Sequence, residues 1–294
     1  MKKSNKVLWV FAGLIFIAVL VLSILNNIHY FSNSKTKASL SYSFNLPGDK
    51  KIIGNKEMTN KFMILSAFDT INANGDFAIT LNPGTENSII MTSDENILPY
   101  INISQNNNEI SLSTQQGVSL RSLQPKKAVI TASTMLNHID LSGISSLQAM
   151  NLNTNNLTLE MRGMNLADIQ GNIKKIQIDL SGKPILHLKL FDADNIILDI
   201  HGMGTVYLSG KTKSLNISSS GNAMVSASNL IADNVVITTA GMSNINIHAL
   251  KTLSVITTGK SMIKYSGNPN ITKNIAGNAI IEKSSDYVVI PAAQ

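Results

Sequence analysis

The sequence predicts an all-β protein: a parallel β-solenoid of about seven coils, preceded by one N-terminal transmembrane helix. Three observations lead to this prediction. A glycine recurs every 18 to 20 residues in the C-terminal half, apolar residues occupy every second position around it, and one long uncharged apolar segment lies near the N-terminus. Together they indicate a repetitive β domain held behind a membrane anchor.

The N-terminal segment is the candidate anchor. Residues 1–6 carry three lysines and form the expected cytoplasmic tail, and residues 7–25 (VLWVFAGLIFIAVLVLSIL) carry no charge. Nineteen helical residues at about 1.5 Å each span roughly 28 Å, close to the hydrocarbon thickness of a bilayer. No small-x-small cleavage site follows, so an uncleaved signal-anchor is favoured over a cleaved signal peptide and over a buried core helix. The preceding lysines predict that the domain lies in the periplasm or outside the cell.

The charge distribution argues against nucleic-acid binding. The chain has 24 Lys and Arg against 18 Asp and Glu, a net charge of +6. Five lysines and no acid lie in residues 1–37, which leaves 19 bases and 18 acids for the rest. A nearly neutral body lacks the basic patch that phosphate binding requires. The absence of cysteine also excludes thiol catalysis and Cys-ligated metal sites.

Composition divides the remaining chain into three parts. Residues 26–61 are rich in Ser, Asn and Lys without sustained periodicity, which predicts a flexible linker. Residues 62–283 form the expected β-solenoid domain, with an irregular first part at 62–136 and glycine-turn repeats at 137–283. Residues 284–294 are expected to be a C-terminal tail.

The repeats are centred on eight glycines. Around the first seven, the positions six, four and two before the glycine and four and six after it are apolar in 31 of 35 cases. Alternate side chains of a strand share a face, so each repeat is predicted to be a strand, a glycine turn and a second strand with these positions inside. One repeat cannot bury its inner face, so the repeats must stack as coils. The eighth unit places Lys273 and Lys283 at inward positions, which is typical of an end cap. The glycines are Gly143, Gly163, Gly182, Gly202, Gly221, Gly241, Gly259 and Gly277.

Two further segments and the turns carry a family resemblance. The opening FDTINANGDFAITLNPG (residues 68–84), the segment NILPYINISQNNNEISLST (residues 96–114) and the turns LSG, MRG, LSG, IHG, SSG, TAG and TTG resemble the bacterial autotransporter-adhesin head domain called the GIN domain. The resemblance covers about residues 62–283. It implies a right-handed β-helix-like fold and an adhesive role, and it transfers no catalytic residue.

An acidic stripe is the strongest candidate for chemistry. The outward position three before the glycine carries a carboxylate on four successive coils, about 4.8 Å apart. Such a stripe could hold calcium or form the carboxylate cluster of a polysaccharide-cleaving β-helix. A solvated stripe balanced by nearby bases is the favoured interpretation. The stripe is Asp140, Glu160, Asp179 and Asp199, and the bases are Arg162, Lys174, Lys175 and Lys189.

His187 and His201 lie nearest to this stripe and are expected to be surface residues. A general base needs a cleft that excludes water, and coils that differ by only two residues in length leave little room for one. The sequence therefore assigns no catalytic, cofactor-binding or metal-binding residue and no cofactor.

The expected function is a non-catalytic, membrane-anchored envelope or surface binding module, adhesin-like, that contacts the membrane through residues 7–25. The late coils present an outward face of Ser, Thr and Asn, which suits hydrogen bonding to a glycan or to an envelope protein. The alternatives are a β-helix carbohydrate-active enzyme that uses the acidic stripe and an envelope scaffold or sensor domain. The outward residues of this polar face are Ser218, Ser220, Ser226, Asn244 and Asn246.

Overall fold

The computed structural model describes residues 49–284, which belong to one compact unit. The expected tail, anchor and most of the linker (residues 1–48) and the chain from residue 285 lie outside the described residues. In the part that is described, the helical structure is a single 3-10 turn at Leu98–Tyr100, and no helix reaches the length and apolarity that a bilayer span requires.

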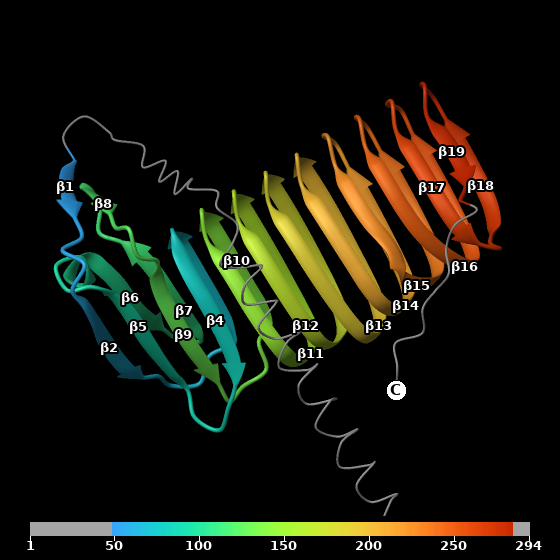
Figure 1. The fold of residues 1–294 in the computed structure, drawn as a ribbon. Coiled ribbons are helices and arrows are strands. Elements are labelled where there is room, and N and C mark those ends of the chain that lie inside the picture. The colour runs from blue at the N-terminus through green and yellow to red at the C-terminus, as the bar shows by residue number, and fades with distance from the viewer. Residues whose placement is uncertain (1–48, 285–294) are drawn as a thin grey trace, which may run out of the picture. The chain divides into compact units, whose positions relative to one another are not determined.

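Nine strands precede the regular repeats, and the rest of the chain builds the coil stack (Figure 1). The first group comprises β1 (Lys50–Ile53), β2 (Met58–Ile64), β3 (Thr70–Gly75), β4 (Phe77–Pro83), β5 (Ser88–Asp94), β6 (Ile101–Asn106), β7 (Glu109–Thr114), β8 (Val118–Arg121) and β9 (Lys126–Ala132). The second comprises β10 (His138–Gly143), β11 (Ser146–Gly163), β12 (Leu166–Gly182), β13 (Ile185–Gly202), β14 (Thr205–Ser219), β15 (Met224–Thr239), β16 (Asn244–Thr257), β17 (Met262–Gly267), β18 (Asn270–Ile275) and β19 (Ile280–Lys283).

The coil stack is parallel and in register. Gly143 pairs with Gly163, Gly163 with Gly182 and Gly182 with Gly202, and the same register continues through β14 to β19. Each long strand from β11 to β16 leaves one glycine corner, passes a second corner where the register shifts, and reaches the next glycine. The prediction of an all-β parallel solenoid of about seven coils is confirmed. Its right-handedness stays a prediction.

The glycine column begins one coil before the sequence repeat. Strand β3 pairs in parallel with β10, so that Gly75 lies beside Gly143, and β4 pairs in parallel with β11. Residues 70–83 are therefore a first, incomplete coil within the part expected to be irregular. The sequence period does not show it, because an insertion of more than fifty residues separates it from the next coil.

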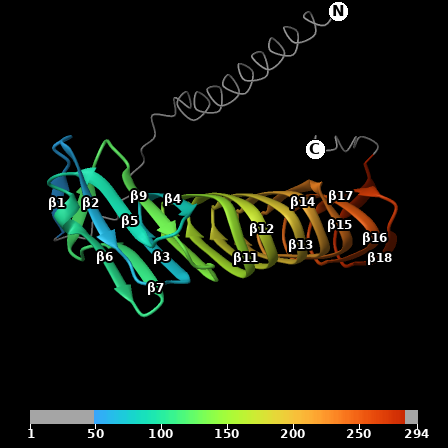
Figure 2. The same cartoon turned by 90° about the horizontal axis from the view of Figure 1, so that it is seen from below.

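That insertion caps the N-terminal end of the stack (Figure 2). Its strands β7 and β9 pair in parallel with β3 and β4, while β5 pairs antiparallel with β2 and β9, and β6 antiparallel with β7. The change to antiparallel pairing ends the coil repeat and covers the open face of the first coil.

The inward positions predicted from the sequence form the core. Of the 35 positions, 33 are buried, and the exceptions are the exposed Asn137 and the half-buried Tyr265. In the last coils the column two before the glycine changes from Leu, Met or Ile to the hydroxyl residues Ser219, Thr239 and Thr257, which stay buried. Thr239 Oγ1 donates to Thr257 Oγ1 at 2.8 Å, and the Ser219 and Ser243 hydroxyls lie 3.0 Å apart. Hydrogen bonding between coils thus satisfies these polar groups inside the core.

The glycines are required mainly because the coils approach each other closely. At each glycine of the column from residue 143 to residue 277, a Cβ would lie less than 3.0 Å from the carbonyl oxygen of the glycine in the preceding coil. A positive φ accompanies this approach at Gly182 (90°) and Gly202 (146°) but not at Gly221, Gly241 or Gly259. Close backbone packing is therefore the common cause, and the left-handed conformation is an additional cause in some coils.

Candidate binding pocket and outward faces

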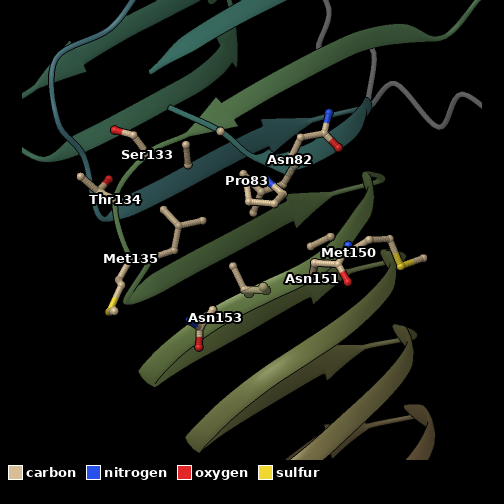
Figure 3. Close-up of a pocket in the computed structure, with 14 residues that line it drawn as sticks. Asn82, Pro83, Ser133, Thr134, Met135, Met150, Asn151 and Asn153 are labelled. Carbon is tan, nitrogen blue, oxygen red and sulfur yellow. The ribbon is translucent and has the colours of Figure 1, made fainter. Parts of the chain in front are cut away.

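The incomplete first coil leaves a pocket at the junction with the cap. Strand β4 pairs with β11 only along residues 146–149, and the chain then leaves the stack at Gly84 instead of turning the second corner. No strand of the first coil fills the place beside the second corner of β11. The result is a pocket of about 240 Å³ between the end of β4, the segment after β9 and the middle of β11 (Figure 3).

Three unengaged amides point to binding in this pocket. The side chains of Asn82, Asn151 and Asn153 are exposed and make no hydrogen bond with any residue of 49–284. Asn151 adopts a left-handed conformation (φ 59°) where the register of β11 shifts between Ala149 and Leu152. Each amide offers both a donor and an acceptor, so the three together can bond a ligand rich in hydroxyl groups.

The opposite wall combines fixed polar groups with a flexible apolar one. Thr134 Oγ1 donates to the carbonyl oxygen of Phe68, and the Ser133 backbone N–H donates to Asn87 Oδ1 at 2.7 Å. Met135 adds an adaptable thioether side chain to this wall, and Met150, beside Asn151 on β11, adds another on the side of the amides (Figure 3). None of the fourteen residues that line the pocket is ionisable. The pocket therefore has hydrogen-bonding and apolar groups but no general acid, general base or charged ligand for a metal.

The acidic stripe has the predicted register. Within residues 49–284, its first two carboxylates form ion pairs and its last two do not. Asp140 pairs with Glu160, Glu160 with Asp179 and Asp179 with Asp199. The guanidinium of Arg162 forms ion pairs with both Asp140 and Glu160. Asp179 is exposed and Asp199 is partly buried, and neither makes a salt bridge with a described residue.

Asp140 is the most enclosed carboxylate of the stripe. Its side chain is 13% exposed, and its Oδ1 atom is buried without a hydrogen-bond partner. Burial raises the pKa of Asp140 above its usual value, and the charge of Arg162 offsets this only in part. Across residues 49–284, no group of three or more His, Asp or Glu side chains is arranged to hold a metal ion.

The lysine and histidine side chains that the sequence placed near the stripe lie apart from one another. Lys174 pairs with Asp192 at 3.3 Å, at the second corner of the coil. The His187 ring packs edge-on against Tyr207 with centroids 4.9 Å apart, in the predicted column. His201 Nδ1 lies 3.0 Å from Ser220 Oγ. These contacts are those of surface side chains between coils and do not converge on one point.

Sequence reasoning missed the pocket because it looked for chemistry along the uniform coils. The pocket lies where the coil length changes, between the insertion and the first complete coil. The Asn-rich stretch at residues 151–156 (NLNTNN) is the signal that could have drawn attention to it.

Comparison with known proteins places this geometry in a family. The model of the family described as "Putative auto-transporter adhesin, head GIN domain" matches residues 67–269. No curated protein matches the chain.

Solved structures share the fold at low sequence identity. A "putative lipid binding protein" from Parabacteroides distasonis ATCC 8503 has a TM-score of 0.73 at 19% identity, over 80% of this chain and 100% of that one. A "putative adhesin" from the same organism has a TM-score of 0.68 at 18% identity, over 80% and 100%. A "putative adhesin" from Parabacteroides merdae ATCC 43184 has a TM-score of 0.67 at 19% identity, over 80% and 99%. At this identity the likeness establishes the fold alone.

Proposed function

The chain belongs to the auto-transporter adhesin head GIN domain family, and from this premise we propose that it is a non-catalytic binding module of the bacterial cell envelope or surface. Residues 7–25 anchor it in the membrane as a single span, and the solenoid lies in the periplasm or outside the cell. Two of the similar structures carry the name adhesin, which agrees with a binding role.

The pocket between cap and coils is the proposed binding site. The observation that carries the proposal is its lining, which has three unengaged amides and no ionisable side chain. Such a lining favours a neutral, hydroxyl-rich ligand, and we propose a glycan. A few well-placed polar groups beside apolar side chains are typical of sites that bind a ligand without transforming it.

Glycan-array binding tests this proposal with the full chain held in lipid nanodiscs. The variant Asn151→Gly removes one amide and keeps the left-handed backbone, because glycine adopts that conformation freely. The matched control is Asn107→Gly, since Asn107 is also left-handed (φ 53°) and exposed but lies outside the pocket. We expect Asn151→Gly to weaken glycan binding about tenfold, as expected for the loss of a ligand hydrogen bond, and Asn107→Gly to leave it unchanged. Equal binding by both variants would contradict the pocket assignment.

The same preparation tests the alternatives. Release of product from an acidic polysaccharide, abolished by Asp179→Asn, would establish an enzyme that uses the acidic stripe. Co-purification of one envelope protein without glycan binding would establish a scaffold or sensor domain. We expect neither result.

A further inference from the structure

One outward edge of the solenoid carries exposed apolar side chains on consecutive coils. The edge lies just after the glycine corner and consists of Ile185, Met203, Met224, Met242, Met262 and Ile280, which we call the apolar stripe. One of these residues comes from each of six successive coils, and their exposed fractions lie between 38% and 57%. Exposed hydrophobic residues scattered singly need no explanation, but a continuous line of them indicates a contact surface.

The register explains why the stripe is continuous. Ile185, Met224, Met262 and Ile280 share the column three after the glycine, and Met203 and Met242 lie one after it in the two coils where that column has Thr205 and Asn244. An apolar residue is therefore present in every coil at one of two adjacent outward positions. Toward the C-terminal end, Met224, Met242, Met262 and Ile280 line a shallow groove of about 400 Å³ together with Lys260.

The two faces beside the glycine corner differ in charge. The outward positions of the face after the glycines carry two carboxylates, Asp168 and Glu282, against four lysines, Lys183, Lys189, Lys260 and Lys264, of which Lys264 pairs with Glu282 at 3.2 Å. The face before the glycines carries the acidic stripe, whose basic partners in residues 49–284 are Arg162, paired with Asp140 and Glu160, and His138, whose Nε2 lies 3.7 Å from Glu160. An anionic surface would attract the first face and repel the second.

The size of the stripe argues against a second copy of the chain as its partner. Six coils about 4.8 Å apart extend roughly 24 Å, and a stripe about 10 Å wide then covers about 240 Å². A stable dimer needs about 800 Å² from each partner. A membrane to which the chain is already tethered needs far less intrinsic affinity, because the tether keeps the local concentration high.

We propose that the apolar stripe rests on an anionic lipid bilayer, with the methionines in the interface and Lys183 and Lys260 against the headgroups. The inference rests on the anchor that forms part of the proposed function. The 23 residues between Leu25 and Asp49 reach at most about 80 Å when extended, so the connection permits the side-on approach. Methionine suits this role because its flexible side chain adapts to a fluid partner, and lysines near the surface are attracted to anionic lipids.

Site-specific labelling tests the proposal, because the chain has no native cysteine. The full chain is reconstituted in vesicles of one part phosphatidylglycerol to two parts phosphatidylcholine, with a fluorophore at Met242→Cys or, as a matched control, at Val236→Cys. Val236 is 39% exposed and lies on the face before the glycines. We expect nitroxide-labelled lipid to quench the Met242 label at least about threefold more than the Val236 label, since quenching requires contact with lipid, and Lys183→Glu with Lys260→Glu to remove most of the difference.

Flotation of the vesicles distinguishes a failure of the membrane anchor from a failure of the docking proposal. A chain that floats with equal or no quenching at the two positions overturns the docking proposal and leaves the anchor in place. A chain that does not float overturns both the anchor and the docking. Energy transfer between Met242 labels on different chains, without lipid quenching, would assign the stripe to a second copy and overturn the proposal.

Discussion

The two corners of each coil hold the stack together by different means. At the glycine corner, the backbones of neighbouring coils approach so closely that no Cβ fits, and the position is glycine in every coil from residue 143 to residue 277. The second corner has glycine only in some coils, at Gly171, Gly210 and Gly267, where a Cβ would also overlap the backbone of the preceding coil, and its register shifts from coil to coil. There, Lys174 pairs with Asp192 at 3.3 Å, Asp194 with Lys213 at 2.6 Å and Asp233 with Lys251 at 2.8 Å. We call this second bend the charged corner.

The comparison shows where the fold depends on residue identity. The glycine corner accepts only glycine because a larger side chain would overlap the preceding coil. At the charged corner, the side-chain charge alternates between positive and negative on successive coils, which favours the pairing of each coil with its correct neighbour. Exposed ion pairs contribute little to stability, so the charged corner adds to the choice of register more than to the free energy of unfolding. Coil lengths of 18 to 20 residues are accommodated at the charged corner.

We expect the largest loss of stability from substitution of the buried side chains that lie between the two corners. Leu198 is fully buried, and Asp199, the next residue, points outward and is partly exposed. We expect Leu198→Asp to destabilise the protein by about 4 kcal/mol or more, because an unpaired charge enters the core, and Asp199→Ser to cost less than about 1 kcal/mol. Thermal unfolding followed by circular dichroism measures both, and similar midpoints for the two variants would refute the assignment of inside and outside.

The glycine corner should be the next most sensitive. A Cβ at residue 221 would meet the carbonyl oxygen of Gly202, while one at Gly117, which has a φ of 72°, would meet nothing within 4 Å. We expect Gly221→Ala to cost about 3 kcal/mol through steric overlap and Gly117→Ala about 1 kcal/mol through backbone strain alone. Denaturant unfolding at matched protein concentration gives both values. A larger loss of stability for Gly117→Ala than for Gly221→Ala would show that the left-handed backbone conformation, and not the close approach of the coils, is the reason that the corner requires glycine.

The acidic stripe should show a pH-dependent effect of moderate size. The pKa of Asp140 is raised by burial, so the folded chain binds this proton more tightly than the unfolded chain, and ionised Asp140 opposes folding as the pH rises above about 4. We expect Asp140→Asn to raise the thermal midpoint by about 2 °C at pH 7 and to lose this gain near pH 3. A lower midpoint for the variant at pH 7 would show that the ion pair with Arg162 outweighs burial.

The charged corner should give the smallest effect. A hydrogen bond from Lys213 lowers the pKa of Asp194 in the folded chain. The stability that ionised Asp194 contributes is therefore present above the pKa of Asp194 in the unfolded chain and is lost as the pH falls through the folded-state pKa. We expect Asp194→Asn to change the midpoint by less than about 1 °C at low salt, and by nothing measurable near 0.5 M sodium chloride, where screening removes the interaction. A salt-independent loss of several degrees would make this corner as important as the glycine corner.

The sequence predicted the parts of the fold that repeat and missed the parts that occur once. Glycine spacing and two-residue alternation correctly placed 33 of the 35 inward side chains of the seven repeats, including the buried Thr239 and Thr257, because a polar residue at an inward column stays inward in a stack. The first coil and the pocket were missed because they arise where an insertion interrupts the period. The ion pairs of the charged corner depend on shifts of register between coils, which no single alignment of the repeats contains.

The in-register stacking of the coils is the central claim, and cross-linking between engineered cysteines tests it most directly. Ser218 and Thr238 are register partners on β14 and β15, and Ser218 and Val236 are displaced by two residues on the same outward face. A strand spacing of about 4.8 Å and a rise of about 3.3 Å per residue place the first pair about 5 Å apart and the second about 8 Å apart. We expect a bifunctional thiol reagent with a 5 Å span to join Ser218→Cys to Thr238→Cys rapidly and Ser218→Cys to Val236→Cys slowly. Equal rates, or faster joining of the displaced pair, would contradict the stacking of the coils described above.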